Sequence, residues 1–145
     1  CLPSGPYVKE GGDMDRYRFR VSRYGENLDN LERIHAIMAV NNPACQIIVT
    51  VSPVHLWATF RGDLDVISAS CNSKSTLRAA ADEFVVRHDN VFYFPSFEMA
   101  TIYTPIMGKI WLTEGRENFH VNKLTVRFIM RQFFRIFAPG ETLDA

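Results

Sequence analysis

The sequence predicts an α/β fold in which a parallel sheet lies between two layers of helices, a three-layer α/β/α arrangement. Two observations predict it. Apolar residues change along the chain from helical spacing to short continuous runs, in the order helix, strand, helix, strand, helix. This order is typical of parallel strands joined by crossover helices. The short runs are largely apolar without alternation, which is typical of strands buried on both faces.

The N-terminal part of the chain predicts one irregular segment, one helix and one strand. Residues 1–25 are rich in glycine, proline and charge, which favours irregular or extended structure. From Asn27 apolar residues recur at helical spacing until the Asn-Asn-Pro sequence at 41–43. These apolar positions are Leu28, Leu31, Ile34, Ile37 and Met38. The apolar run 46–52 then predicts a buried strand, which Pro53 ends.

A second helix follows a loop over residues 53–65 and a short β-like run at 66–69. Asn72 and Ser73 offer an N-cap for this helix, because their side chains can accept hydrogen bonds from free backbone N–H groups. The polar residues 88–90 end it. Its expected buried face consists of Leu77, Ala80, Ala81, Phe84 and Val85.

The C-terminal part predicts a second strand at 91–94 and a last helix. Residues 99–116 show no clear period and predict a loop with a helical turn. Asn122 is a candidate N-cap for the last helix, which the Pro-Gly pair at 139–140 closes. The expected buried residues of this helix are Leu124, Phe128, Ile129, Phe133 and Phe134.

Length and composition are those of one domain. The chain has 145 residues, 47% of them hydrophobic, which is enough for a sizeable core. We expect an α/β core over residues 26–138, preceded by the irregular segment 1–25 and followed by a tail at 139–145. Basic and acidic residues are balanced at 16 each, which argues against nucleic acid as a partner. No apolar run approaches the roughly 18 to 20 residues that span a bilayer.

Cysteine and histidine usage predicts no disulfide framework, metal site or cofactor. The cysteines are Cys1, Cys45 and Cys71, an odd number without paired spacing. The histidines are His35, His55, His88 and His120, and no two lie at the spacing of metal ligands. The cysteine pattern favours a reducing compartment such as the cytoplasm. Nothing in the sequence indicates an oligomeric state.

Polar residues follow both predicted strands. Ser52 and His55 follow the first strand, and Ser96 and Glu98 follow the second. The reactive site of an open parallel sheet lies beyond the carboxyl ends of its strands, so these four residues are candidates for a substrate pocket. Ordinary turn chemistry beside Pro53 and at the second strand's exit is the alternative explanation.

Glu117 and His120 precede the last helix and are the candidate catalytic pair. An acid three residues before a histidine can orient the imidazole and stabilise its charged form, so that it acts as a general base. Such a base needs a nucleophile, usually a serine. Cys71 is a poorer candidate, because a free cysteine is usually a small buried apolar residue. The alternative is a surface histidine at a helix start, with an acid favoured by the helix dipole.

Three segments of the chain together resemble the GSCFA family, a branch similar to the SGNH/GDSL-type hydrolases. The segments are Thr50-Val51-Ser52-Pro53-Val54-His55-Leu56 with Ala58-Thr59-Phe60, then Ser73-Lys74-Ser75-Thr76-Leu77-Arg78-Ala79-Ala80, then Tyr93-Phe94-Pro95-Ser96-Phe97-Glu98. Their order and spacing also match, and the resemblance covers about residues 17–137.

The resemblance implies a flavodoxin-like hydrolase fold with a serine nucleophile and an acid-x-x-His pair near the C-terminus. Glu117 and His120 match that pair, with Glu where the family type has Asp. The Gly-Ser-Cys-Phe-Ala segment that carries the nucleophile does not occur in the 145 residues. The Ala-Ser-Cys-Asn sequence at 69–72 lies between the wrong elements. We therefore expect a partial domain that lacks its nucleophile.

The expected function is that of the C-terminal part of an SGNH-like serine esterase or acyl hydrolase. Its substrate would be a small-molecule or carbohydrate ester, with O-acyl groups on carbohydrates as one candidate. Two other functions stay open at this point. One is a non-catalytic module that binds a carbohydrate or an acyl group, and the other is an acyltransferase that uses the same groups.

Overall fold

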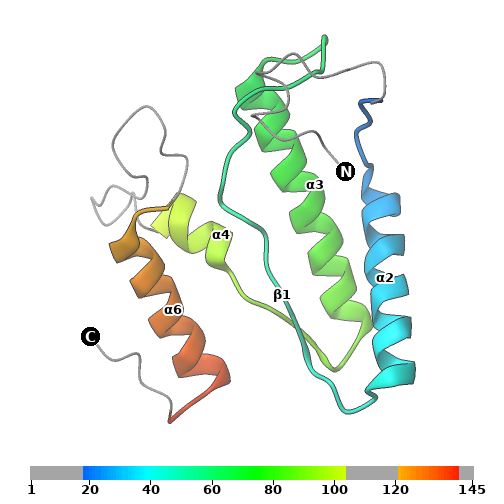
Figure 1. Ribbon diagram of the computed structural model, residues 1–145, viewed down its shortest axis with the longest axis vertical. Helices are drawn as coiled ribbons and strands as arrows, with labels where there is room; N and C mark the ends of the chain where they lie inside the picture. Colours follow the sequence, from blue (N-terminus) through cyan, green and yellow to red (C-terminus); the bar gives the residue numbers. More distant parts are fainter. Residues whose placement is uncertain (1–17, 104–120, 141–145) are drawn as a thin grey trace.

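The computed structural model describes residues 18–103 and 121–140 as a mixed α/β structure. The elements in chain order are α2 (Tyr24–Asn41), β1 (Ile47–Val49), α3 (Val66–Arg87), β2 (Val91–Tyr93), α4 (Ser96–Glu98), the π-helical turn η2 (Met99–Tyr103) and α6 (Lys123–Phe137). The α2 and α3 helices lie side by side, and α6 lies on the other side of β1, next to α4 (Figure 1). The predicted α/β class is confirmed.

The two strands form a parallel pair, as the alternation of elements predicted. Ile47 lies opposite Val91, and Val49 lies opposite Tyr93. The prediction that the first strand is buried on both faces is wrong, because Ile48 is 38% exposed. Its neighbours at 47 and 49 point to the other face and pack against the core beneath α2 and α3, since side chains alternate along a strand.

The core on that face is built around Phe84 of α3, which is 1% exposed. The buried residues of this first cluster are Leu28, Ala80, Phe84 and Val91. Leu31, Ile47, Val49 and Val85 pack against them. The cluster therefore joins α2, α3 and both strands.

A second cluster lies on the side of α6. Its buried residues are Phe94, Ala100 and Ile129. Met99, Val121, Phe128, Phe133 and Phe137 pack against them. The Phe94 ring meets Phe133 edge-on at 5.2 Å between centroids, a favourable geometry for aromatic pairs. The predicted packing of Phe128 and Phe133 agrees with these contacts.

The start of α3 differs from the sequence-based expectation. Residues 66–69 are not a strand but the first turn of the helix, and the N-cap is Asp65 rather than Asn72 or Ser73. The Asp65 carboxylate accepts hydrogen bonds from the backbone N–H groups of Ile67 and Ser68, both at 2.9 Å. These bonds satisfy donors that a helix start leaves free, so the helix begins two turns earlier than predicted. The predicted end at His88 is confirmed.

The α6 helix begins where predicted, because the Asn122 side chain accepts a hydrogen bond from the Thr125 N–H at 2.8 Å. Phe128, Ile129 and Phe133 pack in the second cluster as expected, and only the first turn of α6 differs from the expectation. Leu124 is 76% exposed, whereas Thr125 and Ile129 are buried. Leu77 of α3 was also expected to be buried and is 39% exposed. Helical spacing identified both helices, but the neighbouring elements decide which residues of an apolar face are covered.

The α2 helix begins at Tyr24, three residues before the predicted start, and ends at Asn41 as predicted. It is tied to the end of α3 by polar contacts. His88 Nε2 lies 2.7 Å from Glu32 Oε2, and the His88 ring stacks on His35 with 3.7 Å between centroids. The hydrogen bond to His88 holds the pKa of Glu32 below its ordinary value. No helix of the described part of the chain is both long and apolar enough to cross a membrane.

We predict that Phe84→Ala lowers the free energy of unfolding by about 3–5 kcal/mol, because it opens a cavity in the core shared by α2, α3 and the strands. Val86→Ala on the same helix is the control. Val86 is 79% exposed, so its truncation should change stability by less than about 0.5 kcal/mol. Urea denaturation followed by circular dichroism measures both. Equal effects of the two changes would contradict the assigned core.

We also predict that the stabilising effect of Glu32 depends on pH. Because the pKa of Glu32 is lowered in the folded state, its contribution is present above the unfolded value of about 4.5 and is lost as pH falls through the folded value. Glu32→Gln should therefore destabilise the protein at pH 7. This loss of stability should become smaller as the pH falls below about 4.5. Thermal unfolding of both proteins from pH 3 to 7 tests this. A constant difference across that range would disprove the link.

Candidate functional site

The exits of the two strands lie against each other. The Phe94 N–H donates to the Val49 carbonyl at 2.8 Å, which continues the pairing beyond β2. The hydroxyls of Thr50 and Ser96 are 2.5 Å apart, and Ser96 Oγ donates to the Val51 carbonyl at 3.3 Å. Parallel strands end at the same edge of a sheet, so residues 46 positions apart in the sequence meet there.

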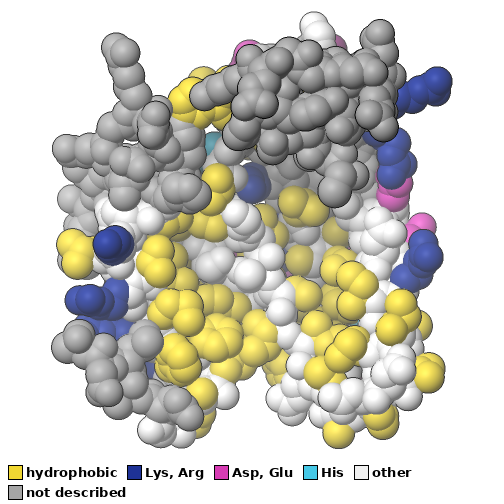
Figure 2. Space-filling view, viewed as in Figure 1, with side chains coloured by type: hydrophobic (Ala, Val, Ile, Leu, Met, Phe, Trp, Pro, Cys, Tyr) yellow, Lys and Arg dark blue, Asp and Glu magenta, His cyan; other side chains and the backbone are white. Residues whose placement is uncertain are grey.

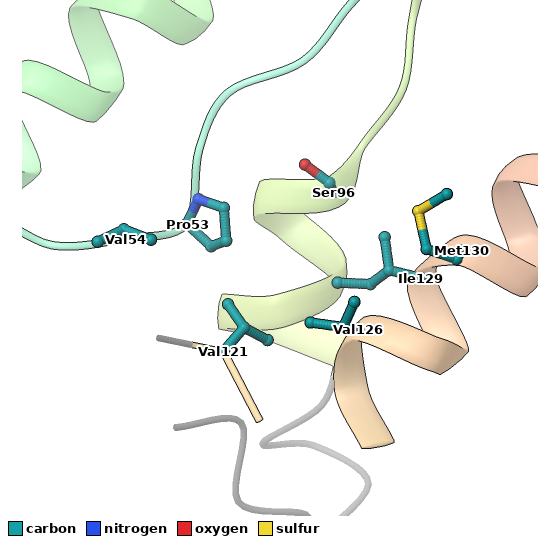
Figure 3. Close-up of a pocket in the computed structure, with 7 residues that line it drawn as sticks. All are labelled: Pro53, Val54, Ser96, Val121, Val126, Ile129 and Met130. Atoms are coloured by element: carbon teal, nitrogen blue, oxygen red, sulfur yellow. The ribbon is translucent and has the colours of Figure 1, made fainter. Parts of the chain in front are cut away.

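A pocket of about 350 Å³ opens beside these exits. Pro53 and Val54 come from the segment after β1, and Ser96 comes from the start of α4 (Figure 3). The remaining lining residues are Val121, Val126, Ile129 and Met130. The pocket therefore lies between both strand exits and the first half of α6. The described residues that line it are largely apolar.

Of the four predicted pocket residues, Ser96 lines this pocket. Ser52 is exposed, and its hydroxyl accepts a hydrogen bond from the Val54 N–H at 3.2 Å. That bond is local turn chemistry on either side of Pro53, which is the alternative that the sequence left open.

His55 is directed toward α3. Its Nδ1 lies 3.3 Å from the hydroxyl of Ser70, which is buried and also accepts a hydrogen bond from the Leu56 N–H. Burial lowers the pKa of His55, and the positive charge of Lys74 lowers it further. This contact fixes the loop after β1 on the start of α3.

Glu98 is part of a polar cluster that links α3, β2 and α4. Its carboxylate accepts hydrogen bonds from the Tyr93 hydroxyl at 2.9 Å and from Arg78 Nε at 2.8 Å. The Arg78 guanidinium lies 4.1 Å from the centre of the Tyr93 ring, and it also pairs with Asp82. Burial and the hydrogen bond to Glu98 raise the pKa of Tyr93 above its ordinary value.

Arg78 and Tyr93 were not singled out as site residues from the sequence. The Arg78–Asp82 pair could have been noticed from its i,i+4 spacing on a helix. The approach of Tyr93 and Glu98 to Arg78 depends on the way α3 packs against β2, which no local pattern indicates.

The predicted catalytic pair, Glu117 and His120, lies outside the described residues. The first described residue after it is Val121, which lines the pocket. Cys71 is exposed on α3. Within the ranges 18–103 and 121–140, no three His, Cys, Asp or Glu side chains are grouped so that they could hold a metal ion.

Comparison with known proteins adds one finding. The model of the GSCFA family matches residues 1–133, which is most of the chain. Searches of curated proteins and of solved structures gave no match. The match includes the strands, α3 and the residues at both strand exits, and it covers well over half of the sequence. The chain therefore belongs to the GSCFA family.

Proposed function

We propose that this chain is the C-terminal part of an SGNH-like ester hydrolase with a three-layer α/β/α domain. The observation that carries the proposal is the position of the pocket. It adjoins the carboxyl ends of two parallel strands, where ligands bind in open α/β sheets. Val121 lines this pocket and directly follows His120 in the sequence, which supports His120 as the base. Packing of apolar residues on both faces of the strand pair supports the layered domain.

In the proposed reaction a serine hydroxyl attacks the carbonyl carbon of an ester while His120 takes its proton. The tetrahedral intermediate collapses, and the alcohol leaves with that proton. Water, activated by the same imidazole, then releases the acid from the acyl-enzyme. Glu117 holds the imidazole in the required tautomer and stabilises its positive form. The mechanism needs no metal or organic cofactor.

The serine of this mechanism belongs to a segment outside the 145 residues, since Gly-Ser-Cys-Phe-Ala does not occur among them. Ser96 is the substrate-pocket residue with the strongest support, because it is one of the residues that line the pocket. Ser52, His55 and Glu98 stay predictions. A carbohydrate ester with an O-acyl group remains the candidate substrate.

A second candidate is a module that binds a carbohydrate or an acyl group without reacting with it, and a full-length gene without a serine after its first strand would favour that candidate. An acyltransferase with the same groups would differ from a hydrolase only in its acceptor. Product analysis with competing alcohols would separate those two reactions.

We predict that the 145-residue chain by itself does not hydrolyse p-nitrophenyl acetate above the background rate. Without the serine nucleophile, the histidine base cannot promote formation of an acyl-enzyme. Release of p-nitrophenol by the purified chain is the measurement, and His120→Gln tests whether any turnover depends on the proposed base. Turnover above background that His120→Gln abolishes would contradict the prediction.

In the full-length gene product we predict ester hydrolysis that depends on His120. Replacing a general base typically costs about 10²–10⁴-fold in kcat, so His120→Gln should lower kcat by that amount. The matched control is His35→Gln. His35 lies between α2 and α3, 2.9 Å from Asn90, and does not line the pocket. Full activity of His120→Gln would refute the proposed base, and binding of ester without hydrolysis by the unmodified protein would favour the non-catalytic module.

A further inference from the structure

The pocket beside the strand exits is lined almost entirely by hydrocarbon. Six of its seven lining residues are proline, valine, isoleucine or methionine, and the seventh is Ser96. Ile129 at its base is 8% exposed and belongs to the second core cluster. Figure 2 shows apolar side chains gathered over the lower half of the face in view. None of the described lining residues is charged.

Ser96 offers little to a strongly polar ligand. Its hydroxyl lies within hydrogen-bonding distance of Thr50 Oγ1 and of the Val51 carbonyl, so its one hydrogen already has acceptors inside the protein. A carboxylate placed in this pocket would find no positive side chain among the described lining residues. A sugar would leave several hydroxyls without partners, and each unpaired polar group costs free energy on burial.

We infer that this pocket binds the hydrocarbon part of the acyl group in the substrate ester. The inference takes ester hydrolysis from the proposed function and adds which half of the ester enters the pocket. A volume of about 350 Å³ lies at the lower end of the range for small-molecule sites and has room for a short alkyl chain. The sugar or other alcohol part of the ester then lies outside the pocket.

The geometry provides a probe that reports on binding without any catalysis. Met130 lines the pocket, whereas Met38 lies on α2 and does not. The methionine methyl groups of the 145-residue chain can be labelled with ¹³C and followed by NMR during titration with 1-butanol, 1-hexanol, hexanoate and glucose. Met130→Leu identifies the Met130 signal.

We expect the Met130 signal to shift in a saturable way with 1-hexanol and the Met38 signal to stay in place. Each additional buried methylene strengthens binding about fourfold, so 1-hexanol should bind about 15-fold more tightly than 1-butanol. Hexanoate and glucose should bind more weakly than 1-hexanol by at least about tenfold, since neither polar group finds a partner.

Val126→Asp tests the wall of the pocket. Val126 lines it and is 44% exposed, so a carboxylate is tolerated there while making the pocket polar. We expect at least tenfold weaker binding of 1-hexanol. Leu124→Asp places the same charge on the same helix at a residue that is 76% exposed and does not line the pocket, and it should leave binding unchanged. If Val126→Asp does not fold, Val54→Asp changes the opposite wall.

Equal shifts of Met130 and Met38, or equal effects of the two aspartates, would overturn the inference. So would binding of glucose in preference to 1-hexanol. Failure of this inference can be distinguished from failure of the proposed function. Saturable binding of 1-hexanol with no hydrolysis by the full-length gene product refutes the hydrolase and keeps the alkyl pocket. Hydrolysis that depends on His120 but keeps the same acyl-length preference in Val126→Asp refutes the pocket and keeps the hydrolase.

Discussion

Pairing of β1 with β2 in parallel register is the constraint on which the other features depend. Two strands of three residues each make few hydrogen bonds, yet their direction places the segments after them at one edge. The bond between Thr50 and Ser96 is the direct consequence. An antiparallel pair would have sent residues 50–54 and 94–98 to opposite ends, and the pocket between them would not exist.

Each face of this strand pair is covered in a different way. The face toward α2 and α3 carries aliphatic residues packed around Phe84, which join the two helices and the strands into one core. The face toward α6 carries Phe94, and its covering is aromatic and less complete, so that Phe92 stays 37% exposed. The pocket lies at the edge of this second, looser side. Incomplete packing there leaves room for a ligand, whereas the tight core opposite holds the strand exits in position.

The polar residues near the strand exits divide into two groups. Glu98 is bound to Tyr93 and Arg78, and His55 is bound to Ser70, so these side chains connect α3 to the strand exits. Ser96 differs because it lines the pocket while its hydroxyl is bonded to the backbone of the first exit. A polar residue after a strand can thus hold the strand exit in place or line the pocket. Its hydrogen-bond partners show which of these roles it has.

The sequence by itself determined the class of fold, the order of the elements and their parallel pairing, because periodicity and capping are local properties of the chain. It located the ends of α2 and α3 and the Asn122 cap of α6, and it identified both strand exits as candidates for a site. It misplaced the start of α3, because the β-branched pair Val66 and Ile67 resembles the start of a strand until the Asp65 cap is recognised. Only the tertiary structure decided that Leu77 and Leu124 are exposed, that Ile48 lies on a partly open face, and that Glu98 pairs with Arg78. These outcomes depend on which neighbouring element covers a surface. Contacts between segments that are distant in the sequence produce no periodic pattern, so the sequence does not reveal them.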